Sequence, residues 1–277
     1  MADPVARPLH ERIADPVFRA AVACIDAGDV DGLASLLAEN PSLTGVITHL
    51  PGEGYFENPT LLEFIAENPV RHGRMPDNVA DVARKILSAD PPPPASSIAM
   101  TLGLVCSGRV VRECGHQIDL IALLVAHGAD PSSAMRAALG HGEFAAAEAL
   151  LAHGAEMDLP VAAGLGRTDE ASDLLKGTSP ERRHLALALA AQHGHAEIVR
   201  LLLDAGGDPD RFNPDGAHAH STPLHQAALA GHETVVEALL SHGARRDLPD
   251  KVHAALPWQW ARHAGHDALA ERLKPAT

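Results

Sequence analysis

The segment at residues 221–244, STPLHQAALAGHETVVEALLSHGA, constrains the fold more than any other part of the chain. Pro223 suits the first position of a helix, where its missing N–H has no partner to lose. This helix is predicted to end at Gly231, and the next one carries an apolar stripe at helical spacing, formed by Val235, Val236, Leu239 and Leu240. Because one helix pair cannot bury that stripe alone, it has to pack on a neighbouring pair. The segment therefore predicts a stack of helix pairs.

Degraded copies of this segment recur along the chain. The closing phrase Leu-Leu-x-x-Gly, or a close variant, ends at Gly128, Gly154, Gly177, Gly206 and Gly243. Looser copies lie at residues 18–40, 59–87 and 257–273. The last copy has a polar outer face, as the end cap of a repeat array requires. Together these copies predict about eight helix pairs.

The Thr-Pro-Leu-His phrase, the Gly-His turn and the closing phrase resemble the ankyrin-repeat family in its bacterial form. The resemblance covers roughly Asp15 to Lys274 and is most specific between His184 and Ala244. It implies an all-α ankyrin-repeat solenoid that forms a single domain at residues 15–274 after an N-terminal tail at residues 1–14. Within the domain, an N-terminal cap at 15–43, central repeats at 59–252 and a C-terminal cap at 255–274 are expected.

The same resemblance implies a protein-interaction scaffold that holds a protein or peptide partner in its concave groove and between its finger loops. The sequence contains no P-loop, no Gly-x-Ser-x-Gly phrase and no His-Glu-x-x-His phrase. We therefore expect a binding protein without a cofactor, and not an enzyme.

Composition and charge narrow the partner and the compartment. Asp and Glu number 36 against 22 Lys and Arg, for a net charge of −14. Nucleic acid is not an expected partner, because binding to phosphates requires clustered cations. No apolar run is long enough for a membrane helix, and the amino terminus lacks the apolar segment of a secretory signal. Three scattered cysteines fit a reducing, cytoplasmic compartment, and the 3% of aromatic residues predicts a core of Ala and Leu. The polar end caps predict a monomer.

The spacing of the repeats departs from the family pattern at the fingers, which are the turns between helix pairs. The closing glycines from Gly128 to Gly206 lie closer together than the ankyrin period of about 33 residues. The central fingers are therefore predicted to be short, leaving the groove open around Pro131, Pro160 and Pro180. The finger before Thr222 is instead longer than the family pattern, because the four residues 217–220 are inserted there. This insertion predicts one extended finger.

The inserted residues include His218 and His220, whose imidazoles are ligands suited to zinc or another divalent metal. We expect His193, Gln192 and His141, near the ends of inner helices, to share a groove wall with this finger. The alternative function is thus a small-molecule or metal-binding protein, extending to a metal-dependent hydrolase with His218, His220 and His193 as ligands and Glu67 or Glu113 as base. The competing interpretation is an exposed loop whose imidazoles never meet. His225, within Thr-Pro-Leu-His, is instead predicted to hydrogen bond in its turn.

A second departure is the long loop at residues 46–58, which contains the only tyrosine, Tyr55. An exposed Tyr is a common binding anchor, although packing on the first inner helix is the alternative. Glu67 and Asn68 follow at the predicted groove end of an inner helix, and Arg71 either receives a carboxylate or phosphate or caps a helix end. Phe212 and Trp258, with His218 and His220, complete the residues expected to bind a peptide.

Overall fold

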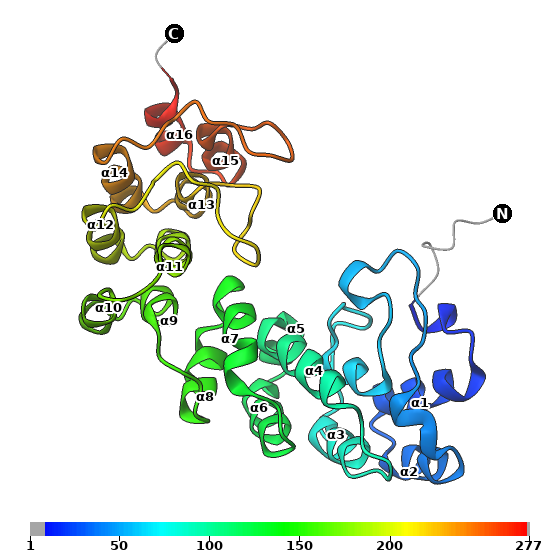
Figure 1. The fold of residues 1–277 in the computed structure, drawn as a ribbon. Coiled ribbons are helices and arrows are strands. Elements are labelled where there is room, and N and C mark those ends of the chain that lie inside the picture. The colour runs from blue at the N-terminus through cyan, green and yellow to red at the C-terminus, as the bar shows by residue number, and fades with distance from the viewer. Residues whose placement is uncertain (1–8, 276–277) are drawn as a thin grey trace, which may run out of the picture. The chain divides into compact units, whose positions relative to one another are not determined.

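The computed structural model describes residues 9–275, and within this range it contains helices and loops but no strand. The described helices form eight consecutive pairs, as predicted (Figure 1). The chain divides into two compact units, one ending at Ala155 and the other beginning at Glu156. The expectation of one continuous domain at residues 15–274 stays a prediction. None of the described helices is both long and apolar enough to cross a membrane.

The first unit contains four helix pairs: α1–α2, η5–α3, α4 and α5 with α6, and α7–α8. The second pair differs from the others because its first member, η5, is a 3-10 helix. The elements are η2 (Leu9–Arg12), α1 (Pro16–Ala27), α2 (Val30–Glu39), η3 (Pro41–Gly45), η4 (Gly54–Phe56), η5 (Leu61–Ala66), α3 (Val79–Leu87), α4 (Ala95–Ser107), α5 (Arg109–Glu113), α6 (Gln117–Ala126), α7 (Pro131–Gly140) and α8 (Phe144–Ala152).

The start and the core of the first unit differ from expectation. Residues 1–8 of the predicted tail lie outside the described residues. Ile13 is buried and Arg12 forms an ion pair with Glu53, so the packed structure already includes residues before Asp15. The core contains three fully buried phenylalanines. The rings of Phe18 and Phe56 meet that of Phe64 edge-on, at centroid distances of 5.7 and 5.2 Å. The predicted Ala and Leu side chains are present in this core, but the expectation that large aromatic residues do not contribute to it is wrong for this unit.

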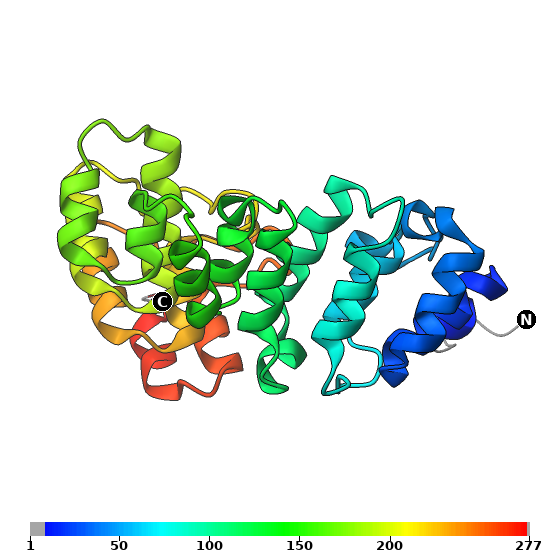
Figure 2. The ribbon, with the colours of Figure 1, turned by 90° about the horizontal axis from the view of Figure 1, so that it is seen from below.

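The second unit contains the other four pairs, whose members contact each other, and Figure 2 shows the helices of the last pair, in orange and red, next to each other. The first helices α9, α11, α13 and α15 contact one another in order and form an inner row, while α10, α12 and α14 form an outer row (Figure 1). Its core consists mainly of Ala, Leu, Val and Ile side chains, as predicted. The elements are α9 (Leu159–Gly164), α10 (Thr168–Leu174), α11 (Pro180–His193), α12 (Ala196–Asp204), α13 (Pro223–Ala230), α14 (Glu233–Ser241), α15 (Pro257–His263) and α16 (Asp267–Leu273).

The glycines of the repeat pattern end helices because they adopt left-handed backbone conformations. The closing glycines have φ values between 85 and 95°. These are Gly128, Gly154, Gly177, Gly206 and Gly243. Such values favour glycine, which has no Cβ to clash. The predicted helix ends are confirmed at these positions.

The histidines of the Gly-His turns link successive repeats of the second unit. His195 Nε2 donates to the Gly164 carbonyl oxygen at 3.2 Å, and His232 Nε2 donates to that of Gln192 at 3.1 Å. Burial lowers the pKa of His195. Each ring also lies against the turn glycine of the preceding repeat, so that a Cβ on Gly194 would come within 2.9 Å of the His232 ring. These imidazoles therefore serve packing.

This contact predicts unequal costs for two glycine substitutions in neighbouring helices. Gly194 and Gly206 have similar φ values of 84 and 87°, but a Cβ on Gly206 would meet nothing within 4 Å. Gly206→Ala should cost about 1 kcal/mol for the left-handed conformation alone. Gly194→Ala should cost at least about 1 kcal/mol more, because His232 must move and lose its hydrogen bond. Urea unfolding of both variants measures the difference, and equal costs would contradict the interlocking turn.

The central fingers are short and the finger before Thr222 is long, as predicted, but a second long loop, which was not predicted, precedes α15. Short connections at residues 127–130, 153–158 and 175–179 separate the central helix pairs, whereas residues 205–222 and 242–256 form long loops. In Figure 1 both long loops, yellow and orange, extend beyond the inner row of the second unit. They provide most of the irregular backbone near α13 and α15.

Candidate functional site

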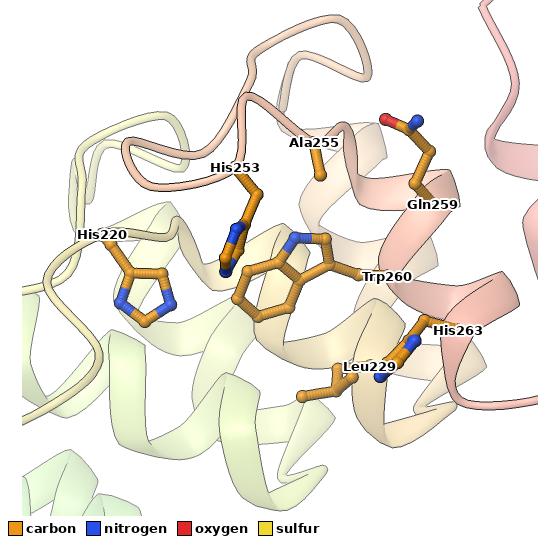
Figure 3. Close-up of a pocket in the computed structure, with 7 residues that line it drawn as sticks. All are labelled: His220, Leu229, His253, Ala255, Gln259, Trp260 and His263. Atoms are coloured by element: carbon orange, nitrogen blue, oxygen red, sulfur yellow. The ribbon is translucent and has the colours of Figure 1, made fainter. Parts of the chain in front are cut away.

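The two long loops and helices α13 and α15 surround a pocket of about 510 Å³, here called the Trp260 pocket. Figure 3 shows Trp260 at its centre, with His220 on one side and His263 on the other. Three of the lining side chains are imidazoles, and none is a carboxylate. The lining residues are His220, Leu229, His253, Ala255, Gln259, Trp260 and His263.

Trp260 lines the pocket and is fixed by contacts within the protein. Its Nε1–H donates to Asp250 Oδ2 at 2.9 Å. The buried His225 ring meets the indole edge-on at a centroid distance of 5.3 Å, and the His220 ring lies 5.6 Å away at a shallow 35°. The indole N–H is therefore used within the protein, and its apolar surface is the part offered to a ligand.

Asp250 organises the loop that carries His253. Its carboxylate accepts hydrogen bonds from the backbone N–H groups of Val252, His253 and Ala255 at 2.8, 2.7 and 3.1 Å, in addition to Trp260 Nε1–H. Burial by itself raises the pKa of Asp250, but these donors outweigh it and hold that pKa at about 2. One buried carboxylate thus positions both an indole and an imidazole of the pocket.

The inserted finger forms a hydrogen-bonded turn. His218 has a positive φ of 62°, and its carbonyl oxygen accepts the N–H and the hydroxyl of Ser221 at 3.0 and 2.9 Å. The N–H of Lys251 donates to the His220 carbonyl oxygen at 2.8 Å, which joins the two long loops. The turn exposes His218 and directs His220 into the Trp260 pocket.

The predicted metal ligands occupy two places in the second unit. His218 and His220 are neighbours with ring centroids 6.2 Å apart, whereas His193 lies beside His195 at 6.4 Å. Among residues 9–275, no group of three or more His, Cys, Asp or Glu side chains is arranged to hold a metal ion. The metal site stays a prediction. His141 belongs to the first unit, where its Nδ1 donates to the Ala137 carbonyl oxygen at 2.9 Å.

His225 has the structural role that the sequence predicts. Its Nδ1 accepts the Thr222 hydroxyl at 2.8 Å, and its Nε2 donates to the Ala255 carbonyl oxygen at 3.2 Å. The side chain is fully buried, and burial lowers its pKa. Gln192 contributes its carbonyl oxygen to His232, as described above.

In the first unit, Tyr55 and Asn68 lie together at the surface. Tyr55 is 62% exposed and donates its hydroxyl hydrogen to Asn68 Oδ1 at 2.7 Å. Asn68 in turn donates to the Leu104 carbonyl oxygen and the Ser107 hydroxyl, both at 3.2 Å. Asn68 is thereby anchored to α4, while most of the Tyr55 surface remains open.

Glu67 and Arg71 are buried in the same unit and hold each other. The Glu67 carboxylate lies 3.2 Å from the Arg71 guanidinium and also accepts the backbone N–H groups of residues 71–73. Arg71 donates to the Phe64 carbonyl oxygen near the end of η5 at 2.9 Å, which is the helix-end cap suggested by the sequence. Glu113, the other predicted base, is exposed and paired with Arg109 at 2.7 Å. A role of these residues in binding or catalysis stays a prediction.

Trp260 is the central residue of the pocket, whereas the predicted binding residue is Trp258. Trp258 is half-buried against the core of the second unit, with Lys274 Nζ 5.4 Å from its ring. When Pro257 is aligned with Pro223, Trp258 matches the apolar core residue Leu224, whereas Trp260 matches the polar Gln226. The other predicted anchor, Phe212, lies under Lys251, whose Nζ is 4.2 Å from the ring centroid.

Comparisons with known proteins agree with this architecture. A family model described as ankyrin repeats (3 copies) matches residues 110–250. The human ARF GTPase-activating protein GIT1 is 41% identical over 80 residues, which are 29% of this chain and 10% of that protein. The putative E3 ubiquitin-protein ligase XBAT31 of Arabidopsis thaliana is 36% identical over 103 residues, or 37% of this chain and 22% of that protein.

A mouse protein, ankyrin repeat domain-containing protein 63, is 33% identical over 96 residues, which are 34% of this chain and 24% of that protein. The similarity to these three relatives thus spans a tenth to a quarter of their lengths. The family model spans half of this chain and covers the helix pairs from α5 to the finger before α15. This chain belongs to the ankyrin-repeat family.

Proposed function

We propose that this chain is a protein-interaction scaffold that holds a segment of a partner protein in the Trp260 pocket. The observation that carries the proposal is a pocket with an indole face and three imidazoles, His220, His253 and His263. Their ring nitrogens have no hydrogen-bond partner among the described residues. A neutral imidazole offers one donor and one acceptor. The backbone of a peptide supplies acceptors and donors for these imidazoles. Its apolar side chains would contact Trp260 and Leu229.

The alternative is a small ligand in the same pocket. The volume of the pocket, about 510 Å³, lies within the range of about 300–1,000 Å³ for small-molecule sites. A bound zinc ion and a hydrolytic activity belong to this alternative and rest on the sequence of the finger alone. The cytoplasmic location, the monomeric state and the bacterial form of the repeats likewise stay predictions.

Site-specific crosslinking tests the proposal. A photoreactive residue replaces Gln259, which is exposed and lines the pocket, or Thr234, which is exposed on α14 outside it. The proposal expects a discrete protein adduct in cells from position 259 and none from 234. Trp260→Ala should weaken the purified complex at least tenfold, because a central aromatic anchor often contributes more than about 2 kcal/mol.

Two results would reject the proposal. One is an adduct that forms equally from both positions, and the other is a complex whose affinity Trp260→Ala leaves unchanged. If the pocket instead retains a small molecule through purification, and this molecule is lost in Trp260→Ala, the alternative is the better description.

A further inference from the structure

A second pocket, of about 220 Å³, lies at the start of α11 and is here called the arginine pocket. The connection before α11, at residues 175–179, is short. Residues of α11 form one wall of this pocket, and the loop after α12 forms the other wall. That wall contains two consecutive glycines without side chains. The lining residues are Pro180, Arg183, His184, Ala205, Gly206, Gly207, Asp208 and Arg211.

Two arginines face this pocket without a carboxylate partner. Neither Arg183 nor Arg211 has an ion pair within 4 Å among the described residues, although the adjacent Arg182 is paired with Asp158. The Nε–H of Arg183 is buried and has no hydrogen-bond acceptor. A buried donor without an acceptor costs free energy, which a bound acceptor would recover.

The other polar groups around the pocket are already engaged. His184 donates from Nε2 to the Phe212 carbonyl oxygen at 2.8 Å, and burial lowers its pKa, favouring the neutral imidazole. Asp208 brings one negative charge, and its Oδ1 accepts the N–H of Asp210 at 2.9 Å. The first turn of α11 is capped by Ser179, whose hydroxyl accepts the N–H of Arg182 at 3.3 Å. The lining side chains therefore carry two positive charges and one negative charge.

Glu181 is the remaining carboxylate nearby. It lies outside the lining of the pocket and is fully exposed, and hydrogen bonds to its own backbone and to Ser179 lower its pKa. The positive charge of Arg211 also lowers the pKa of Glu181, although the two side chains form no ion pair within 4 Å. Glu181 thus leaves the guanidinium groups of Arg183 and Arg211 available to a third group.

We propose that the arginine pocket binds a phosphate group between Arg183 and Arg211. Guanidinium forks pair with phosphate oxygens in a bidentate manner, and a phosphate offers enough oxygens for two arginines. The volume lies below the usual range for drug-sized ligands, which suits one compact group. The phosphate is either a free small molecule or part of a phosphorylated side chain. This site is separate from the Trp260 pocket and does not depend on the function proposed there.

Nuclear magnetic resonance of the intact protein tests the site with inorganic phosphate at constant ionic strength. The Arg183 Nε–H signal should shift with saturation, giving a Kd of about 1 mM or lower. Arg211→Gln should weaken binding at least tenfold. Arg183→Gln should do the same when the backbone N–H of Gly207 is followed instead. Arg200→Gln is the matched control, because this exposed arginine on α12 lies outside the pocket and should leave the affinity unchanged.

A phosphoserine peptide and its serine counterpart separate the two sources of phosphate. Tighter binding of the phosphoserine peptide than of inorganic phosphate would indicate a protein-borne group, and the reverse would indicate a free anion. A shift that never saturates would overturn the site. Equal weakening by Arg200→Gln and Arg211→Gln would also overturn it, because it would reveal a general salt effect.

Discussion

Arg71→Ala is expected to destabilise the first unit by about 3 kcal/mol, the lower end of the range for breaking a buried ion pair. The Arg71 side chain is 3% exposed and contacts the carboxylates of Asp26 and Glu67. Its guanidinium also lies over the Phe64 ring, 5.2 Å from the centroid. Removing it leaves the buried Glu67 carboxylate without its cation, and leaves Asp26 with only the His72 imidazole, whose Nε2 lies 3.0 Å from Oδ2. The cost stays at the lower end because Glu67 keeps its three backbone N–H donors.

Hydrogen exchange is the suitable measurement, because the chain contains two compact units and the effect belongs to one. Amides of α1 and α3 should exchange at least a hundredfold faster in Arg71→Ala, as about 3 kcal/mol implies. Arg84→Ala provides the control. Its ion pair with Asp81 joins two exposed side chains, and such a pair contributes at most about 1 kcal/mol. If both variants exchange alike, the buried network does not stabilise the unit.

The features predicted correctly are those that depend on neighbours in the chain. Gly194 and Gly206 end helices because only a left-handed residue completes the turn, and this requirement is visible in a single repeat. The short central fingers and the long finger before Thr222 follow directly from the spacing of the closing glycines. The role of His225 was predictable for the same reason, since its main partner, Thr222, is three residues away.

The features that were missed depend on distant partners. Arg71 is held by Asp26, which is 45 residues away in sequence, and no spacing rule connects them. The three buried phenylalanines of the first unit come from separate elements of an otherwise aromatic-poor chain. Trp260 becomes a pocket residue only because the inserted finger brings His220 beside it. The predicted and observed sites share His220 because the insertion was visible as a break in the repeat.

Asp250→Asn is expected to destabilise the second unit by about 2–3 kcal/mol at neutral pH, the strength of a hydrogen bond to a charged group. The two carboxylate oxygens of Asp250 accept four N–H groups, including Trp260 Nε1–H. In Asn, an NH₂ group replaces one oxygen and faces N–H groups whose hydrogen bonds it cannot accept. The loop that carries His253 should therefore loosen, and Trp260 should lose its fixed orientation in the pocket.

The effect should depend on pH in a defined direction. The pKa of Asp250 is about 2 in the folded protein, below the usual value of about 3.9 for an unfolded chain. The charged carboxylate therefore stabilises the fold fully above pH of about 4, and this contribution disappears as the pH falls toward 2. Urea unfolding of wild type and Asp250→Asn should show a difference at pH 7 that shrinks over this acidic window. Asp247→Asn, which alters an exposed ion pair with Arg245, should show no comparable difference at pH 7. A gap between wild type and Asp250→Asn that persists unchanged to pH 2 would show that the charge of Asp250 does not stabilise the loop.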